Sequence, residues 1–311
     1  MSTPEPTLEA TGADSTPAPT VYGHPPVLRT LIRRELWEHR ALWIAPLSVA
    51  ALLLVGAIIG KQSFDSNMAA LPEQRSAVFG LVVALAALPQ FFTLGLIVSM
   101  YAADCLYTER KDRSILFWKS MPVSDTLTVL SKLLLALVLV PLGVYLVSAA
   151  TTLLMTGIYY VRAADHVGGV FWEAGTWLRI QGISLLAVIA GVLWYAPITA
   201  YLLLVSAWAR RSVWLWVILP PLVIAMMERI ALGTHHVWSI LMYRMGAVFL
   251  HAGMTPPGAP DGASQPLTLN MLIANINPLP VFANVDLWLG VLVAALLIVA
   301  TIRIRQYRDD T

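Results

Sequence analysis

Long apolar segments separated by short polar ones make up most of the chain after residue 26. A helix needs about 20 apolar residues to cross the roughly 30 Å hydrocarbon core of a bilayer, because each residue adds about 1.5 Å. Six segments meet this length: residues 41–60, 77–103, 125–161, 180–209, 213–232 and 285–302. The pattern predicts an all-α integral membrane protein with six transmembrane helices within one domain, residues 27–311.

The start of the third predicted span has its own local signals. Pro122 disfavours helix in the residue before it, and Ser124 is a residue type that caps helix N-termini. Asp125 follows in the first turn, where a carboxylate interacts favourably with the helix dipole. These residues predict that the helix begins at 124–125.

The first 40 residues divide into a tail and an amphipathic helix. Residues 1–26 contain six prolines and no Lys or Arg, which is typical of a disordered segment. In residues 27–40, apolar side chains follow helical spacing on one face and arginines occupy the rest: Leu28, Leu31, Ile32 and Leu36, then Arg29, Arg33, Arg34 and Arg40. This pattern predicts an interfacial helix that leads into the first span.

The long segment between the fifth and sixth spans is partly apolar. Residues 237–251 have apolar side chains at helical spacing but are too short for a further span. Residues 267–282 are apolar and interrupted by Asn and Pro. Irregular backbone at membrane depth occurs only where it packs on protein or lines a cavity, so we expect a re-entrant element on the outer side.

Composition and charge support a membrane location and indicate an orientation. Hydrophobic residues make up 58% of the chain and charged residues 12%, against about 25% charged in soluble domains. The net charge of +2 is dispersed, so nothing favours nucleic-acid binding. Fourteen of the 20 Lys and Arg residues lie on one side of the predicted spans. The positive-inside rule therefore places both termini and residues 104–132 in the cytoplasm, in a multi-pass protein of the inner (plasma) membrane.

Motifs for catalysis are missing from the sequence. It contains no phosphate-binding GxxxxGK[ST] loop, no HExxH or GxSxG motif and no paired cysteines for zinc. We therefore expect no catalytic residues, no metal site and no cofactor bound by this chain. Glu228 and Arg229, near the end of the fifth span, are candidates for an outer gate, because ionisable residues within spans are often functional. The alternative is that they reach lipid headgroups.

The cytoplasmic hinge, residues 104–132, has an unusual order of side chains. Charged residues at 109–113 precede the apolar run Ile115 to Trp118, and Pro122 follows. A short helix over about 112–120 would present an apolar edge to a groove in a cytosolic partner. A loop that only sets topology would need the basic residues but not the Phe117-Trp118 pair.

This segment resembles the link between the second and third spans of ABC-2 type transporter permeases. The resemblance rests on Glu109-Arg110-Lys111-Asp112-Arg113-Ser114-Ile115, on Ser120-Met121-Pro122-Val123-Ser124 and on Lys132, and the layout agrees over residues 27–311. It implies a homodimer of permease chains and two separate ATPase subunits, which would bind ATP and Mg²⁺. The residues that it implies for coupling to the ATPase are Glu109, Arg110, Asp112, Arg113, Ser114, Phe117, Trp118 and Pro122.

The resemblance implies ATP-driven alternating access and export of a drug, peptide, lipid or glycan, and we favour an amphiphilic or hydrophobic cargo. Two other classes remain open. An ion-coupled secondary carrier would show ionisable groups at mid-span and internal repeats, and neither is evident. A membrane-embedded enzyme would need clustered catalytic side chains, for which only residues 228–251 offer candidates. Co-purification with an ATPase would separate the first class from the other two.

Overall fold

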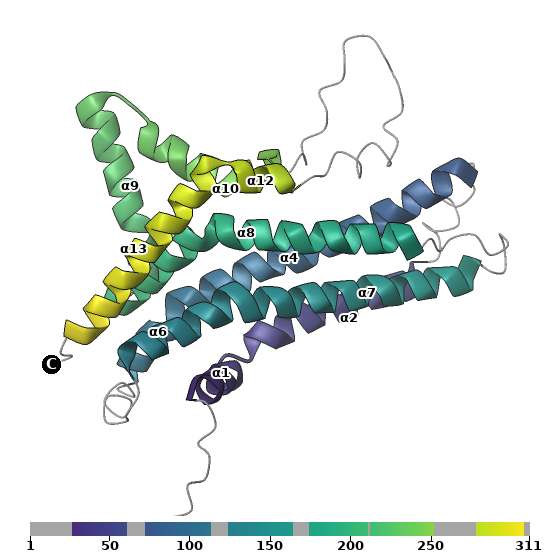
Figure 1. The fold of residues 1–311 in the computed structure, drawn as a ribbon, viewed down its shortest axis with the longest axis horizontal. Helices are drawn as coiled ribbons and strands as arrows, with labels where there is room; N and C mark the ends of the chain where they lie inside the picture. The colour runs from purple at the N-terminus through teal and green to yellow at the C-terminus, as the bar shows by residue number, and fades with distance from the viewer. Residues whose placement is uncertain are drawn as a thin grey trace, which may run out of the picture.

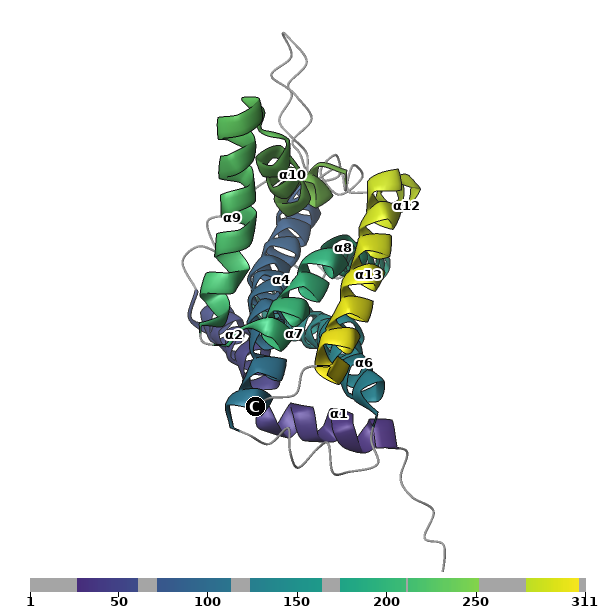
Figure 2. The same cartoon turned by 90° about the vertical axis from the view of Figure 1, so that its left-hand side faces the viewer.

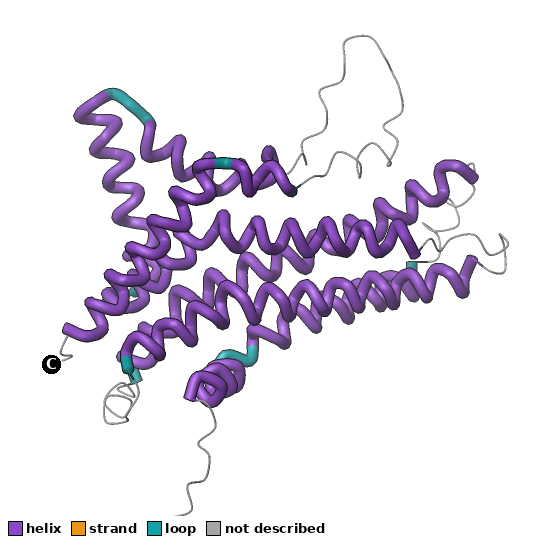
Figure 3. The backbone as a smooth tube through the Cα atoms, viewed as in Figure 1, coloured by secondary structure: helices purple, strands orange, loops and turns teal. Residues whose placement is uncertain are grey.

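The computed structural model describes residues 27–60, 72–112, 124–163, 174–210, 212–251 and 278–307, and these ranges are almost entirely helical (Figure 3). No strand occurs within them. Six of the helices are long and apolar enough to cross a membrane. The predicted all-α architecture with six candidate spans is confirmed, and the predicted tail at residues 1–26 lies outside the described residues.

The helices are labelled in chain order in Figure 1. Their bounds are α1 Val27–Glu38, α2 Ala41–Ile59, α4 Pro72–Lys111, α6 Asp125–Leu134, α7 Val140–Ala163, α8 Ala174–Trp208, α9 Val213–Leu232, α10 His236–His251, α12 Leu279–Ala283 and α13 Val285–Tyr307. A single π-helical segment, η1 (Leu135–Leu139), joins α6 to α7 without a break.

The span boundaries agree with the sequence prediction to within three residues, except at both ends of the second span and at the end of the sixth. The candidate spans are Ala41–Ile59, Leu85–Lys111, Asp125–Tyr159, Trp177–Trp208, Val213–Leu232 and Val285–Tyr307. The second was predicted to end at residue 103 and the sixth at 302, yet both helices continue through charged residues. Glu, Lys and Arg are good helix formers, so a change from apolar to charged residues does not end a helix.

The first turn of α6 has the predicted cap. Ser124 is extended (φ −71°, ψ 145°), and its hydroxyl accepts a hydrogen bond from the Leu127 amide at 3.2 Å. Asp125 lies in the first turn, as predicted. The segment before it, residues 113–123, lies outside the described residues, so the predicted short helix and the Pro122 turn are not described.

The spans form a bundle from which α9 diverges. In this bundle α8 packs against α13 and α4, and α2 packs against α7 and α4. The largest cluster of buried apolar side chains lies between α4, η1 and α8, and includes Tyr101, Leu106, Leu135 and Leu203. By contrast α9 leans away from α2, α4 and α7 (Figure 1), and 0% of its apolar window is buried.

Helices that are not spans lie near both ends of the bundle. Figure 2 shows α1 lying across one end, near the start of α6, and we call this the α1 end. At the opposite end, α10 and α12 lie near the start of α13 (Figure 2). The predicted helices over 27–40 and 237–251 are confirmed as helices. Their interfacial and re-entrant positions stay predictions, and residues 252–277 lie outside the described ranges.

Candidate functional site

Charged side chains from four helices meet at the α1 end. Glu35 comes from α1, Glu109 from the last turn of α4, Asp125 and Lys132 from α6, and Arg305 from α13. We call these five residues the ionic cluster. Glu35, Glu109 and Lys132 are 2%, 5% and 1% exposed, so the cluster is enclosed by protein.

Each cation of the ionic cluster joins two carboxylates on different helices. Lys132 Nζ lies 2.6 Å from Glu35 Oε1 and 3.1 Å from Glu109 Oε1. Arg305 donates from Nη1 to Glu109 Oε2 and from Nε to Asp125 Oδ1, both at 2.9 Å. Glu109 therefore forms an ion pair with α6 through Oε1 and accepts a hydrogen bond from α13 on Oε2.

Two further side chains complete the environment of the carboxylates. The Tyr101 hydroxyl donates to Glu35 Oε2 at 2.9 Å. Arg34 Nη1 lies 3.7 Å from Glu109 Oε1, while its Nε pairs with Glu38. An unpaired charge costs several kcal/mol to bury, so ion pairing and hydrogen bonding allow the cluster to exist in the interior.

Arg110 attaches α8 to the same turn of α4. Its guanidinium donates to the carbonyl oxygens of Ser206 and Ala209, at the C-terminal end of α8. The last carbonyls of a helix have no partner within the helix, and an arginine beside them satisfies them and suits the helix dipole. The Ser206 hydroxyl accepts from the amides of Leu106 and Tyr107 at 3.1 and 3.0 Å. The end of α4 is thus bound to α1, α6, α8 and α13.

The structure places the predicted coupling residues in two different settings. Glu109 is buried within the ionic cluster, Arg110 is directed to α8, and Asp112 is exposed. The other five, Arg113, Ser114, Phe117, Trp118 and Pro122, lie outside the described residues. Of the predicted set, only Glu109 and Arg110 are therefore seen in contact with other helices.

Sequence reasoning did not identify the partners of Glu109. Lys132 entered through the family resemblance, Arg305 was one of the fourteen basic residues counted for topology, and Glu35 had no role. One signal was available, since Glu35 lies on the same face of α1 as Leu31 and Ile32, where an amphipathic helix has apolar residues. The identity of the cation that pairs with Glu35 depends on how the helices pack, which the sequence does not show.

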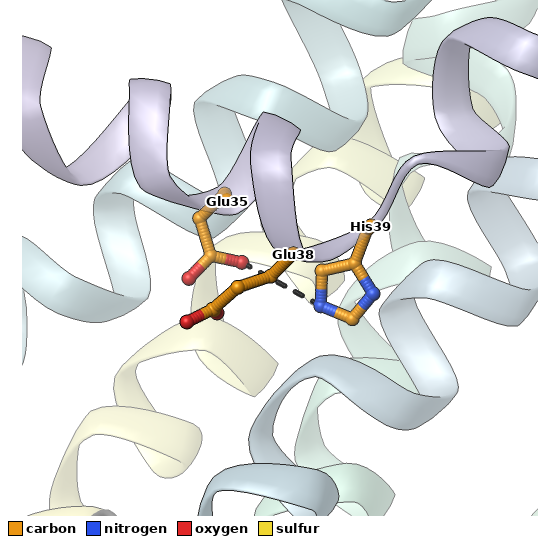
Figure 4. A group of neighbouring side chains, drawn as sticks. All are labelled: Glu35, Glu38 and His39. Carbon is orange, nitrogen blue, oxygen red and sulfur yellow. Dashed lines mark ion pairs between the residues drawn. The ribbon is translucent and has the colours of Figure 1, made fainter.

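Glu35, Glu38 and His39 lie close enough to be considered as metal ligands (Figure 4). Both oxygens of Glu35 are already bound, by Lys132 and Tyr101, and Glu38 accepts from Arg34 at 2.6 Å. Burial lowers the pKa of His39 below its usual 6.5, so the ring is neutral at pH 7 and its 3.9 Å contact with Glu35 is polar rather than ionic. A metal ion would have to displace these donors, and we assign none.

The two predicted gate residues connect α9 to α10 at the opposite end. Glu228 accepts hydrogen bonds from the backbone amides of His236 and Val237, both at 2.7 Å. Arg229 Nη1 lies 2.9 Å from the His235 ring nitrogens. The first amides of a helix lack partners within it, so Glu228 caps α10 from the preceding helix. Both residues thus link the end of α9 to residues 235–237.

Arg244 holds α10 against α8 and α13. Its guanidinium carbon lies 4.6 Å from the centre of the Trp194 ring, and Nη1 donates to the Asp286 carbonyl at 2.9 Å. The Trp194 indole in turn donates to the Arg244 carbonyl at 2.8 Å. Gly290 leaves the space for this guanidinium, because a Cβ at residue 290 would overlap it. The signal in the sequence was a single arginine in an otherwise apolar helix.

Replacing Gly290 with alanine should loosen α10. The added methyl group would displace the Arg244 side chain and weaken its contacts with Trp194 and Asp286, at a cost of about 1–2 kcal/mol. Hydrogen exchange of residues 236–246 should accelerate about tenfold. Gly246→Ala is the matched control, since nothing lies within 4 Å of its added Cβ. Equal exchange rates in both variants would remove the role assigned to Arg244.

Comparison with protein-family models, curated proteins and solved structures gives no match to this chain. Function is therefore inferred from the architecture and from the contacts at the two ends of the bundle.

Proposed function

We propose that this chain is the permease subunit of an ATP-binding cassette exporter of the ABC-2 type. One observation carries the proposal. The last turn of α4, which leads directly into residues 113–123, is bound through Glu109 and Arg110 to four other helices. A force applied to that segment would reach α1, α6, α8 and α13 together.

The ionic cluster gives the segment two attachments. Residues 113–123 lie between the end of α4 at Lys111 and the start of α6 at Asp125, and the cluster includes residues from both helices. Lys132 and Arg305 connect these helices to each other and to α13, so they would move as one body. ATP and Mg²⁺ would be bound by the partner ATPase, and its closure would supply the push.

The predicted coupling residues then have two roles. Glu109 and Arg110 would pass the movement to neighbouring helices, because both are directed into the bundle. Asp112 is exposed and would contact the ATPase together with residues 113–122, including Phe117 and Trp118. In this arrangement α1 and both termini are cytoplasmic, in the plasma membrane, as the distribution of basic residues favours.

Several features support a dimer and an amphiphilic or hydrophobic cargo. No residue in the apolar window of α9 is buried, which leaves its surface open to lipid or to a second permease chain. A path between two chains would be lined by the apolar surfaces of the spans. Glu228, Arg229 and α10 would form the outer gate of that path.

Replacing Trp118 with alanine tests the coupling role. Buried aromatic anchors at interfaces commonly contribute about 2 kcal/mol or more, so affinity for the ATPase should fall roughly thirtyfold. The measurement is pull-down of the ATP-binding subunit, with cargo-stimulated ATP hydrolysis in membranes. Trp288→Ala is a control at the opposite end, where an exposed tryptophan lies on α13. If the Trp118→Ala variant bound the ATP-binding subunit and supported ATP hydrolysis as the wild type does, residues 113–123 would act only as a loop that sets topology.

A further inference from the structure

One side of α1 carries arginines without acidic neighbours. Arg29, Arg33 and Trp37 are exposed and follow one another at intervals of four residues, which places them in one row along the helix. Arg40, just beyond the end of α1, is also exposed, and we call these four residues the stripe. The Arg33 guanidinium lies 5.8 Å from the centre of the Trp37 ring, and Trp37 is 66% exposed.

The other sides of α1 are already occupied or neutral. Leu31 and Glu35 are buried against the bundle. On the third side, Arg34 and Glu38 form an ion pair at 2.6 Å. In the part of the chain that the structure describes, no carboxylate lies within ion-pair distance of the three stripe arginines. Among the described residues, the stripe therefore carries positive charge that no carboxylate pairs with.

The position of α1 places this stripe beside the start of the first candidate span. The helix lies across the ends of the spans (Figure 2), and α2 begins at Ala41, directly after Arg40. The first turns of α2 already expose Trp43, Ile44 and Leu47, which form an apolar surface suited to lipid chains. Trp37 lies four residues before this span, and tryptophan near the end of a span is typical of the headgroup region.

We infer that the stripe binds the phosphate headgroups of anionic phospholipids. A guanidinium binds phosphate oxygens through two parallel hydrogen bonds, and it keeps its charge at any physiological pH. Each basic residue close to an anionic lipid surface increases binding about fivefold. A lipid is favoured over a soluble partner because the stripe directly precedes the first candidate span, whose first turns expose apolar side chains suited to lipid. This inference does not depend on the proposed transport function.

Trp37 provides the measurement. The full-length chain is reconstituted in phosphatidylcholine vesicles that contain brominated phosphatidylglycerol or, at the same mole fraction, brominated phosphatidylcholine. The fluorescence difference between wild type and Trp37→Phe isolates this residue among the 11 tryptophans. Quenching of Trp37 should be at least about threefold stronger with the anionic lipid at low salt. The ratio of Trp37 quenching by the anionic lipid to quenching by the neutral lipid should approach one at high salt.

A charge variant and a control complete the test. In Arg29→Gln/Arg33→Gln/Arg40→Gln, the preference for the anionic lipid should disappear while Trp37 stays accessible to both quenchers. Arg303→Gln, an exposed site at the end of α13, should keep the preference. Equal quenching by the two lipids in the wild type would overturn charge selectivity. Quenching by neither would show that the stripe faces away from lipid, toward a soluble partner, and would also overturn the inference.

Discussion

Replacing Lys132 with methionine should destabilise the α1 end by about 3–5 kcal/mol, the usual cost of removing one partner from a buried ion pair. The Lys132 ammonium lies 2.6 Å from Glu35 and 3.1 Å from Glu109, and in its absence both carboxylates lose this positive charge while they remain buried. The thermal unfolding midpoint in detergent should fall accordingly.

The chain carries its own probe for this change. Cys105, the single cysteine, is 1% exposed and lies on the turn of α4 before Glu109. A maleimide should react slowly with it in the wild type and faster in Lys132→Met, because opening of the cluster exposes that turn. The double variant Glu35→Gln/Lys132→Met removes opposite charges together and should recover much of the loss. An unchanged midpoint and labelling rate in Lys132→Met would rule out a stabilising cluster.

Reversing the charge of Glu109 should have the largest effect of any single change. In Glu109→Lys, a third cation would occupy a buried space already shared by Lys132 and Arg305. The loss of two attractive pairs and the added repulsion should exceed about 5 kcal/mol, which few domains tolerate. We expect little folded protein to be recovered in detergent, as measured by monodisperse size-exclusion yield.

Asp112→Lys is the matched control for this reversal. It makes the same change in charge three residues later, at an exposed position, where most substitutions alter stability by less than about 0.5 kcal/mol. Glu109→Gln should fall between the two, because the amide retains one acceptor without the charge. If Asp112→Lys were as damaging as Glu109→Lys, net charge near the hinge would explain both results, and the buried contacts would not.

Much of the fold could be predicted from the sequence because it depends on local composition. A run of about 20 apolar residues is long enough to cross the hydrocarbon core, whatever surrounds it. The α6 cap was equally predictable, since Ser124 and Asp125 act on backbone groups within one turn. The end of α4 was harder to predict. The charged residues from Asp104 to Lys111 were interpreted as part of a hinge, but they are also good helix formers.

The candidate sites were only partly predictable because their contacts are distant in sequence. Glu109 could be singled out from its neighbours, but its bond to Arg305 spans 196 residues, and that of Lys132 to Glu35 spans 97. At the other end, Glu228 and Arg229 were recognised as ionisable groups near a span end. Their contacts with the start of α10 depend on how the chain turns after Leu232.

By itself the sequence determined which segments are apolar helices, where several of them begin, and that α1 has an apolar and a basic side, because these properties follow from short-range spacing and from the thickness of a bilayer. Only the tertiary structure decided that Glu35, Glu109, Lys132 and Arg305 share one buried cluster, and that Gly290 accommodates Arg244. Buried charges require partners at hydrogen-bonding distance, and the packing of the helices sets which residues meet at that distance.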